Sequence, residues 1–240
     1  MQPVLPQLVG RYAIFDEIAS GGMASVHIGR LIGPAGFSRT VAIKRMHPHI
    51  AKEPEFVAMF VDEARMAARI SHPNVVPTLD VVQSGKELLL VMEYVQGASL
   101  AHLLRHGRRL GLVNEPRLIV PILVGVLRGL HAAHEAKSAM GEPMHLVHRD
   151  VSPHNIMVGV DGVPRVFDFG VAKARGRLRT TQDGKVKGKL AYMAPEQLAG
   201  EAVDRRSDIY AAGVVLWEGL AGRRLFEGDT DAQIYAQVLG

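Results

Sequence analysis

The sequence predicts an α+β fold in which a β-rich first part precedes a mainly helical second part. Short apolar runs separated by turns fill the first ninety residues, together with one helical stripe. From Ser99 onward, longer apolar segments of helical length predominate. We therefore expect an N-terminal tail over residues 1–10, a β-rich lobe over 11–92, a hinge over 93–97 and a helical lobe over 98–240.

The β-rich part contains a hairpin, because two apolar segments flank the Gly21-Gly22 turn. Apolar residues recur at i, i+3 and i+4 within Glu55–Ile70, which predicts a helix. The predicted strands are Arg11–Ala19, Ser25–Leu31, Thr40–Met46 and Leu88–Val95.

The second part contains two segments with the length and apolar density of core helices, Glu115–His134 and Asp204–Leu220. Between them we expect the short strands Asn155–Gly159 and Val163–Phe167. The apolar runs within these helices are too short to span a bilayer, and the first ten residues lack the basic start of a signal peptide. We therefore expect a cytoplasmic location and no membrane contact from this segment.

Composition excludes some kinds of site. The chain has no cysteine, so it offers neither a disulfide framework nor a thiolate metal site. Its formal net charge is +4, yet residues 169–189 alone carry +6, because they hold seven Lys or Arg and one acid, Asp183. The remaining residues sum to −2. Nucleic-acid-binding proteins spread basic charge over a face, so we expect no nucleic-acid partner and interpret this segment as a charged loop.

Glu63 and Lys44 stand out in the β-rich part. Glu63 falls on the apolar stripe of its predicted helix, where a carboxylate is costly unless it is paired. Lys44 ends the strand Val41-Ala42-Ile43-Lys44. If its side chain faces inward, its ammonium can pair with the Glu63 carboxylate. On these residues alone, a helix rotated to expose Glu63 and a strand-end lysine in solvent remain open alternatives.

The Gly21-Gly22 turn is a weak signal for phosphate binding. Glycine-rich hairpins can lay backbone N–H groups over phosphates. Against the template G-x-G-x-x-G-x-V, however, the first and third glycines are Ala19 and Ala24. An ordinary hairpin turn remains the alternative.

Stronger signals follow in a fixed order. His148-Arg149-Asp150 is followed five residues after the aspartate by Asn155, and later by Asp168-Phe169-Gly170, Ala194-Pro195-Glu196 and Asp208. Phosphoryl transfer needs oxygen ligands for a hard metal ion and a carboxylate to accept the proton of the incoming hydroxyl. Asn155 and Asp168 fit the first need and Asp150 the second.

This order resembles the signature set of protein kinases, and finer motifs resemble the bacterial branch of eukaryotic-type (Hanks-type) serine/threonine kinases. The similarity covers roughly residues 11–240. It implies the bilobal protein kinase fold, with an antiparallel N-lobe sheet plus one helix and a mainly helical C-lobe. It also implies that the chain stops before the family's last helices, so that Glu196 would lack its usual arginine partner.

The resemblance implies specific roles. Asp150 would be the catalytic base, Asn155 and Asp168 the magnesium ligands, and Asp208 a brace for the catalytic-loop backbone. Lys44 would hold the ATP phosphates and pair with Glu63. The other residues implied in ATP binding are Ile18, Ala19, Ser20, Gly21, Gly22, Met23, Ala24, Ser25 and Val26 in the loop, Ala42, and Met92, Glu93 and Val95 at the hinge. The implied cofactors are ATP and Mg²⁺, with Mn²⁺ as an alternative to Mg²⁺.

Two departures lie close to the chemistry. Serine/threonine kinases usually carry lysine two residues after the catalytic aspartate, where this chain has Ser152. They carry Gly-Thr before the Ala-Pro-Glu motif, where this chain has Gly188-Lys189. We expect that Lys189 and Ser152 exchange the roles of that lysine and threonine, with Ser152 bonding Asp150 or Lys189. The alternative is that Lys189 is one more cation of a basic loop and Ser152 a harmless small residue.

Thr180 and Thr181 are the predicted phosphorylation sites, because a phosphate there would gather the surrounding arginines and order the loop. Expected partners are protein substrates, and a homodimer that phosphorylates itself in trans is compatible with this control. Three alternatives to a serine/threonine kinase are a pseudokinase scaffold, a small-molecule phosphotransferase and a nucleic-acid binder. The retained catalytic motifs disfavour the first, the Ala-Pro-Glu motif the second and the charge distribution the third.

Overall fold

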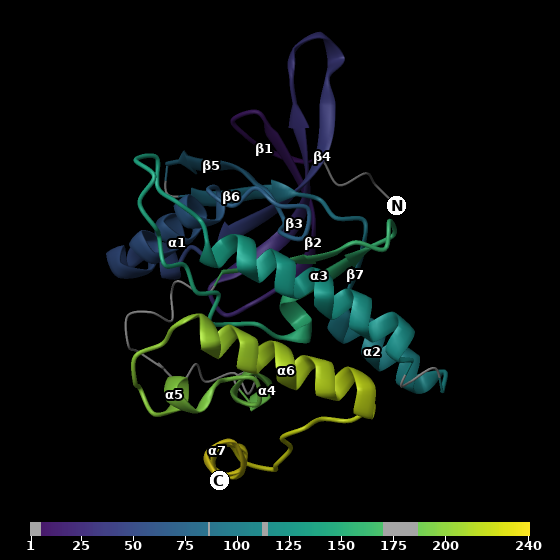
Figure 1. Cartoon of the computed structure of the whole chain (residues 1–240). Coiled ribbons are helices and arrows are strands. Elements are labelled where there is room, and N and C mark those ends of the chain that lie inside the picture. The colour runs from purple at the N-terminus through teal and green to yellow at the C-terminus, as the bar shows by residue number, and fades with distance from the viewer. Residues whose placement is uncertain (1–5, 86, 112–114, 170–186) are drawn as a thin grey trace. The chain divides into compact units, whose positions relative to one another are not determined.

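The computed structural model describes residues 6–85, 87–111, 115–169 and 187–240, and Figure 1 shows their secondary structure. Its contacts divide the chain into two compact units. The first comprises Met1–Ala68 and Val76–Val95, and the second comprises Arg69–Val75 and Gln96–Gly240. The division after Val95 falls inside the predicted hinge, whereas residues 69–75 belong with the second unit although the sequence placed them in the first lobe.

The first unit is built on a six-stranded antiparallel sheet with the order β1-β2-β3-β4-β6-β5. The predicted hairpin is confirmed by β2 and β3, and β1 lies within the segment expected to be a tail. The tight turn after β1 uses Gly10 at a φ of 56°, a conformation that glycine adopts without strain. The strands are β1 (Gln7–Val9), β2 (Tyr12–Ser20), β3 (Ala24–Ile32), β4 (Ser38–Met46), β5 (Thr78–Ser84) and β6 (Glu87–Glu93).

Alternation along β4 positions the functional side chains of this unit. Val41 and Ile43 are fully buried in a core cluster. Ala42 and Lys44 alternate with them along the strand and therefore lie on its opposite face. Helix α1 (Pro54–Ala67) packs near β5, and the 3₁₀ turns η1 (Pro34–Gly36) and η2 (Ile50–Lys52) complete the unit.

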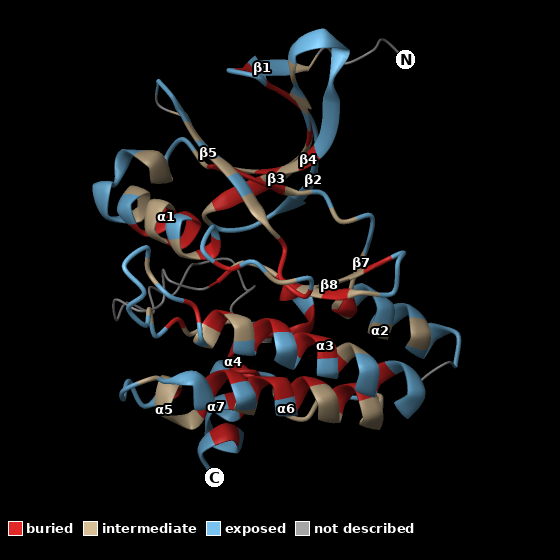
Figure 2. Cartoon of the chain, turned by 45° about the horizontal axis from the view of Figure 1, so that its top comes forward, coloured by how far each residue is buried: buried red, intermediate tan, exposed pale blue. Residues whose placement is uncertain are grey.

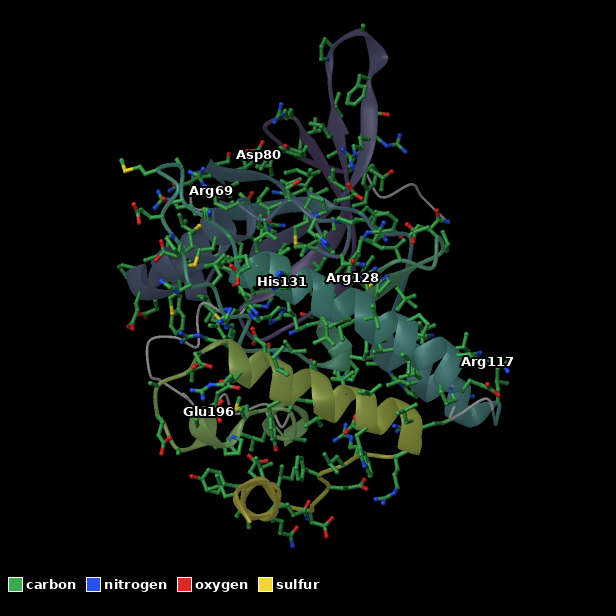
Figure 3. All side chains as sticks on the ribbon, viewed as in Figure 1. Arg69, Asp80, Arg117, Arg128, His131 and Glu196 are labelled. Carbon is green, nitrogen blue, oxygen red and sulfur yellow. The ribbon has the colours of Figure 1, made fainter. Side chains whose placement is uncertain are left out.

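Asp80, labelled in Figure 3, ties β5 to the start of β2. Its Oδ2 accepts hydrogen bonds from Tyr12 Oη at 2.7 Å and from Arg11 Nη2 at 2.8 Å. Partial burial alone would raise the pKa of Asp80, but the hydrogen bonds from Tyr12 and Arg11 outweigh burial and hold this pKa below its ordinary value. The contact therefore fixes the strand that leads into the glycine turn.

The second unit combines a three-stranded sheet with helices. Its strands are β7 (Gly97–Ser99), β8 (Ile156–Gly159) and β9 (Pro164–Val166). The 3₁₀ turn η3 (Pro153–Asn155) lies directly before β8. The helices are α2 (Leu100–Arg109), α3 (Pro116–His134), α4 (Lys187–Leu190), α5 (Pro195–Leu198), α6 (Arg205–Ala221) and α7 (Asp231–Leu239). The two predicted core helices, α3 and α6, lie side by side with their buried faces together in Figure 2.

Glycines on α3 let other backbone approach this helix closely. A Cβ at Gly129 would lie 2.4 Å from the carbonyl oxygen of Asn74, and one at Gly125 would lie 2.4 Å from Pro164. The same carbonyl of Asn74 accepts a hydrogen bond from Val166 N of β9 at 2.9 Å, so Asn74 links β9 to the helix. The glycines therefore hold the sheet strand that precedes Asp168 against the central helix.

Helix α3 corrects one expectation of the sequence. The apolar run judged too short belongs to a 19-residue helix that meets the length and composition of a membrane span. Buried residues on one face, such as Leu123 and Leu130, pack in the unit. Arg117, Arg128 and His131 lie exposed along the helix (Figure 3). A two-faced pattern of this kind is typical of the core helix of a globular domain.

Two glycine substitutions provide a test of this packing. We expect Gly129→Ala to lower the free energy of unfolding by about 1–3 kcal/mol, because its Cβ would overlap the Asn74 backbone. Gly213→Ala is the matched control within α6, since a Cβ there meets nothing within 4 Å. It should raise stability by about 0.5–1 kcal/mol through helix propensity. Urea denaturation measures both, and equal effects would contradict the packing argument.

Candidate functional site

Lys44 and Glu63 form a buried ion pair in the first unit. Lys44 Nζ lies 2.9 Å from Glu63 Oε1, with the two side chains only 15% and 11% exposed. The lysine ammonium also lies 5.9 Å from the ring centre of Phe60 on α1. The prediction that Glu63 lies on the buried face of its helix is therefore confirmed. The inward-facing Lys44 is the partner that offsets the desolvation cost of this buried carboxylate.

The glycine turn is fastened to the strand that carries Lys44. Gly21 N donates to Ala24 O at 2.9 Å, which closes the turn, and Val26 of β3 pairs with Lys44 of β4. His47, just after β4, donates its backbone N–H to Met23 O at 3.0 Å. Its ring Nε2 lies 2.9 Å from Gly21 O and must donate, because a carbonyl oxygen only accepts. One residue thus holds two points of the turn.

The segment expected to bind adenine begins at the end of β6. Met92 is buried and pairs in register with Ala42, so these two predicted residues are neighbours on adjacent strands. Glu93 donates its N–H to Pro77 O at 3.0 Å, and its carboxylate pairs with Arg39 at 2.7 Å. The predicted hinge residues are therefore anchored directly before Val95.

Asp208 organises the predicted catalytic loop of the second unit. This carboxylate is 1% exposed and accepts the backbone N–H groups of His148 and Arg149, each at 2.8 Å. His134 of α3 contacts the same carboxylate through Nε2 at 2.7 Å. Arg149 has a φ of 62°, a strained conformation for a residue other than glycine. The three contacts hold the strained backbone immediately before Asp150, as the predicted brace requires.

Asp150 meets two of the predicted residues. Asn155 donates its side-chain N–H to Asp150 O at 2.8 Å, which closes the loop, and Lys189 Nζ lies 2.8 Å from Asp150 Oδ2. The backbone of Lys189 is held by Tyr192, whose N–H donates a hydrogen bond to Lys189 O at 3.2 Å. Tyr192 Oη in turn donates to the buried Glu218 at 2.7 Å. Burial and the Glu218 carboxylate raise the pKa of Tyr192, so the phenol stays protonated as the donor.

Ser152 does not take the place expected for it. Its backbone is extended, with φ −159° and ψ 163°, and the residue is 2% exposed. Within the described part of the chain its buried Oγ has no hydrogen-bond partner. The expected hydrogen bond from Ser152 to Asp150 or Lys189 is therefore wrong, because the extended backbone buries the hydroxyl instead of presenting it to those groups. Of these two residues, Lys189 is the one that the described structure brings to the Asp150 carboxylate.

Asn155 and Asp168 offer oxygen atoms of the kind that hard cations bind. Because Asn155 Nδ2 donates to Asp150 O, its Oδ1 is the side-chain atom that remains to coordinate a cation. Asp168 has a φ of 60°, so its backbone is held in an uncommon conformation. No group of three or more metal-binding His, Asp or Glu side chains exists among the described residues. A metal ion held by this pair would complete its shell with phosphate and water oxygens.

The structure tests the expectation about Glu196 but not the one about the phosphorylation sites. Glu196, labelled in Figure 3, accepts a hydrogen bond from Ser207 Oγ at 2.5 Å, so its carboxylate has a polar contact within the chain. Thr180 and Thr181, together with Gly170 of the Asp-Phe-Gly motif, lie outside the described residues.

Comparisons with known proteins assign the family. The model of the protein kinase domain matches residues 12–239. The chain belongs to the protein kinase family. A tyrosine-protein kinase named MasK from Myxococcus xanthus is 43% identical over 98% of this chain and 36% of its own length. Two similar serine/threonine kinases are the probable PknB of Bifidobacterium longum (37%) and the PknB of Mycobacterium leprae (34%).

The kinase aligns over 95% of its residues with the Bifidobacterium protein and 97% with the Mycobacterium protein, and these alignments cover 32% and 36% of the relatives. The chain thus spans about a third of the length of the curated relatives it matches. Family membership establishes a protein kinase domain whose relatives are bacterial Hanks-type enzymes. Such domains use ATP, a divalent metal ion and protein substrates.

Two residues of this kinase escaped the sequence analysis. His134 lies on α3, sixteen residues before Asp150, and only the fold brings it to Asp208. His47 lies three residues after Lys44, and that short spacing on a strand is the one signal that could have drawn attention to it. A histidine near a loop is common, so the spacing alone carried little weight.

The His47 contact generates a prediction about ATP binding. We expect His47→Ala to weaken ATP binding about three- to tenfold, because one hydrogen bond that fixes the turn is lost. Adenosine, which has no phosphates, should bind as before. His47→Gln keeps an N–H donor and should restore most of the ATP affinity. His49→Ala removes the ring stacked on His47 at 5.5 Å without removing the donor, and serves as the control. Calorimetry with ATP and adenosine measures the effect, and equal losses for both ligands would contradict it.

Proposed function

We propose that this protein kinase domain transfers the γ-phosphoryl group of ATP to serine or threonine hydroxyls of proteins. The observation that carries the proposal is the Asp150 loop. A buried carboxylate, Asp208, holds its backbone, and a cation, Lys189, contacts its side chain. The similarity to two serine/threonine kinases supports the choice of substrate hydroxyl.

In the proposed reaction, Asp150 orients the acceptor hydroxyl and takes its proton. The hydroxyl oxygen forms a bond to the γ-phosphorus while the bond from phosphorus to the β-phosphate oxygen breaks, and ADP leaves. Asp150 suits this role because Asp208 and Asn155 fix the backbone on both sides of it. Such positioning keeps the carboxylate at the reacting hydroxyl without a reorganisation cost.

Asn155 and Asp168 are the proposed ligands of Mg²⁺, which supplies charge neutralisation on the phosphates when bound. The Lys44–Glu63 pair is the proposed phosphate contact of the first unit. Because Glu63 fixes the ammonium from one side, Lys44 keeps an ordered position with N–H donors for oxygen anions. ATP contacts are further proposed for the glycine turn, for Ala42 and for the Met92–Val95 segment.

Lys189 is proposed to supply the cation that other kinases place in the catalytic loop. Its ammonium already bonds Asp150 Oδ2, so it lies one hydrogen bond from the group that meets the acceptor hydroxyl. Stabilising charge on the transferring phosphoryl is an electrostatic task that does not depend on where the side chain starts. Ser152 has no part in this proposal, since its hydroxyl is buried without a partner in the described structure.

Tyrosine specificity is a second candidate. The MasK relative, at 43% identity, carries a tyrosine-kinase name. This chain also lacks the catalytic-loop lysine typical of serine/threonine kinases, since Ser152 stands in its place. Phosphoamino-acid analysis of the products separates the two candidates.

We also propose control by phosphorylation at Thr180 or Thr181, because the surrounding segment holds several cations that a phosphate would gather. Self-phosphorylation within a homodimer, a role in bacterial signalling and a cytoplasmic location without membrane contact complete the proposal. The pseudokinase scaffold remains the contrasting function, and turnover distinguishes it.

Turnover itself provides the first test. With Mg²⁺–ATP and a mixed set of serine, threonine and tyrosine peptides, we expect phosphoserine or phosphothreonine as the main product. Asp150→Asn should lower kcat by a factor of at least about 100, because the base is lost. Asp168→Ala or removal of metal by EDTA should abolish turnover. Asp161→Asn, an exposed aspartate paired with Arg165, is the control and should act like wild type. Phosphotyrosine as the main product would favour the second candidate.

Lys189 gives a kinetic prediction. Loss of a charge used mainly in the transition state lowers kcat more than it raises KM. Lys189→Ala should therefore lower kcat by roughly 10- to 100-fold with an ATP KM within about twofold of wild type. Lys189→Arg keeps the charge and should retain more activity. Ser152→Lys combined with Lys189→Thr tests whether the cation can return to the catalytic loop. An unchanged kcat in Lys189→Ala would remove Lys189 from the mechanism.

A further inference from the structure

Gln197 joins the start of helix α5 to the backbone directly before Asp150. Its side-chain Nε2 lies 3.2 Å from Arg149 O, and its Oε1 lies 3.2 Å from Ala194 N. A backbone carbonyl only accepts and a backbone N–H only donates, so both partners require the same orientation of the amide. Gln197 is half-buried and follows Glu196, which Figure 3 labels. The fold brings this amide to a residue 48 positions earlier in the chain.

Capping of α5 does not by itself explain the amide. At the third position of a helix, glutamate and glutamine both accept the N–H of the N-cap residue, and the helix dipole favours glutamate. The bond from Ala194 N needs such an acceptor and nothing more. What glutamine adds to glutamate is an N–H donor, and the structure directs this donor at Arg149 O. The second bond is therefore the feature that calls for a function.

The carbonyl that Gln197 bonds belongs to the peptide group between Arg149 and Asp150. Asp208 holds the preceding peptide group, because its carboxylate accepts Arg149 N at 2.8 Å. Asn155 holds the following peptide group, because its amide donates to Asp150 O at 2.8 Å. The Gln197 bond thus restrains the peptide group that lies between these two fixed points.

Rotation of this peptide group would turn the Asp150 side chain, because it changes ψ of Arg149 and φ of Asp150 together. Arg149 has a φ of 62°, where residues other than glycine are strained, so its backbone relaxes unless neighbouring groups hold it. Two contacts oppose the rotation. Gln197 donates to the carbonyl oxygen at 3.2 Å, and the N–H of the same peptide group donates to His148 Nδ1 at 3.3 Å.

We propose that Gln197 is a positioning residue of the kinase reaction, which fixes the peptide group before Asp150 and so orients the carboxylate. It acts through the backbone of Arg149 rather than by contact with the reacting atoms. The inference rests on the proposed role of Asp150 as the base. Lys189 contacts the Asp150 side chain, so the stretch 189–197 holds the base both at its carboxylate and at its backbone.

Three substitutions separate the two bonds. Gln197→Glu keeps the acceptor for Ala194 N and loses the donor, whereas Gln197→Lys keeps a donor and loses the acceptor. Gln197→Met loses both and adds no charge. We expect kcat to fall about two- to tenfold in Gln197→Glu and Gln197→Met, the factor that one hydrogen bond corresponds to, and less in Gln197→Lys. The KM for ATP should stay within about twofold of wild type, because the change acts on the base.

Thermal unfolding should rank the variants in a different order. Gln197→Glu keeps the cap and should unfold near the wild-type temperature, whereas Gln197→Lys and Gln197→Met should unfold earlier. A residue that only caps α5 would give the same order for rate and stability. Gln237 provides the matched control, since its amide accepts Glu227 N at 3.0 Å and donates to Glu227 O at 2.8 Å. Gln237→Glu removes the same kind of donor from α7 and should leave kcat unchanged.

Hydrogen exchange reads the loop without turnover. In a peptide that covers residues 146–152, the amides of His148 and Arg149 should exchange faster in Gln197→Glu and Gln197→Met, because a loosened loop opens more often. Gln237→Glu should leave this exchange as in wild type. Mass spectrometry of the digested protein measures both.

The outcomes are separable. A wild-type protein that phosphorylates no peptide overturns the proposed function and this inference with it. Normal turnover with an unchanged kcat in Gln197→Glu and Gln197→Met overturns the inference alone. A slow Gln197→Glu beside a normal Gln197→Met would assign the effect to the added charge, and slow turnover with unchanged exchange of the loop would assign it to another route. Either result also overturns the inference.

Discussion

The buried carboxylate of Asp208 is the constraint on which the proposed catalytic loop depends. It accepts two backbone N–H groups and contacts His134, so a single side chain joins α6, α3 and the residues before Asp150. Arg149 keeps its strained backbone only because these bonds over-determine it. A base that is held in this way needs no reorganisation when the substrate arrives, which is the main contribution that a protein can make to phosphoryl transfer.

Charges in this kinase fall into two groups according to burial. Glu63 with Lys44 and Glu218 with Tyr192 are buried and paired, because an unpaired charge in the interior would cost several kcal/mol. Exposed pairs such as Arg11–Asp80 and Arg205–Glu135 stay partly in contact with water, so solvent bears much of the cost of each charge. The buried pairs fix the positions of functional side chains, whereas the exposed pairs contribute little to stability.

Much of the fold and part of the site could be predicted from local patterns. Periodicity predicted α1, the length and apolar density of two segments predicted α3 and α6, and short apolar runs beside turn residues predicted β2, β3 and β4. The three-residue strands β1 and β7 are too short to leave a pattern, and they form because a neighbouring strand pairs with them. Helix α2 was not identified as a separate helix because half of its ten residues are Arg or His and only Leu100 is buried. Ser152 was misjudged because its residue type suggests a hydrogen bond, whereas its backbone decides where the hydroxyl lies.

The sequence by itself determined the family and the order of its motifs, because these follow from residue types at fixed spacings. The residues alone left the pairing of Lys44 with Glu63 open, since a rotated helix could also have exposed the carboxylate to water, and the family resemblance was what predicted the pair. Only the tertiary structure decided that Lys189 rather than Ser152 meets Asp150, that His47 holds the glycine turn and that His134 contacts Asp208. Each of these contacts depends on how the chain folds between the two residues, and the direction of a side chain follows from the backbone and packing around it rather than from its position in the sequence.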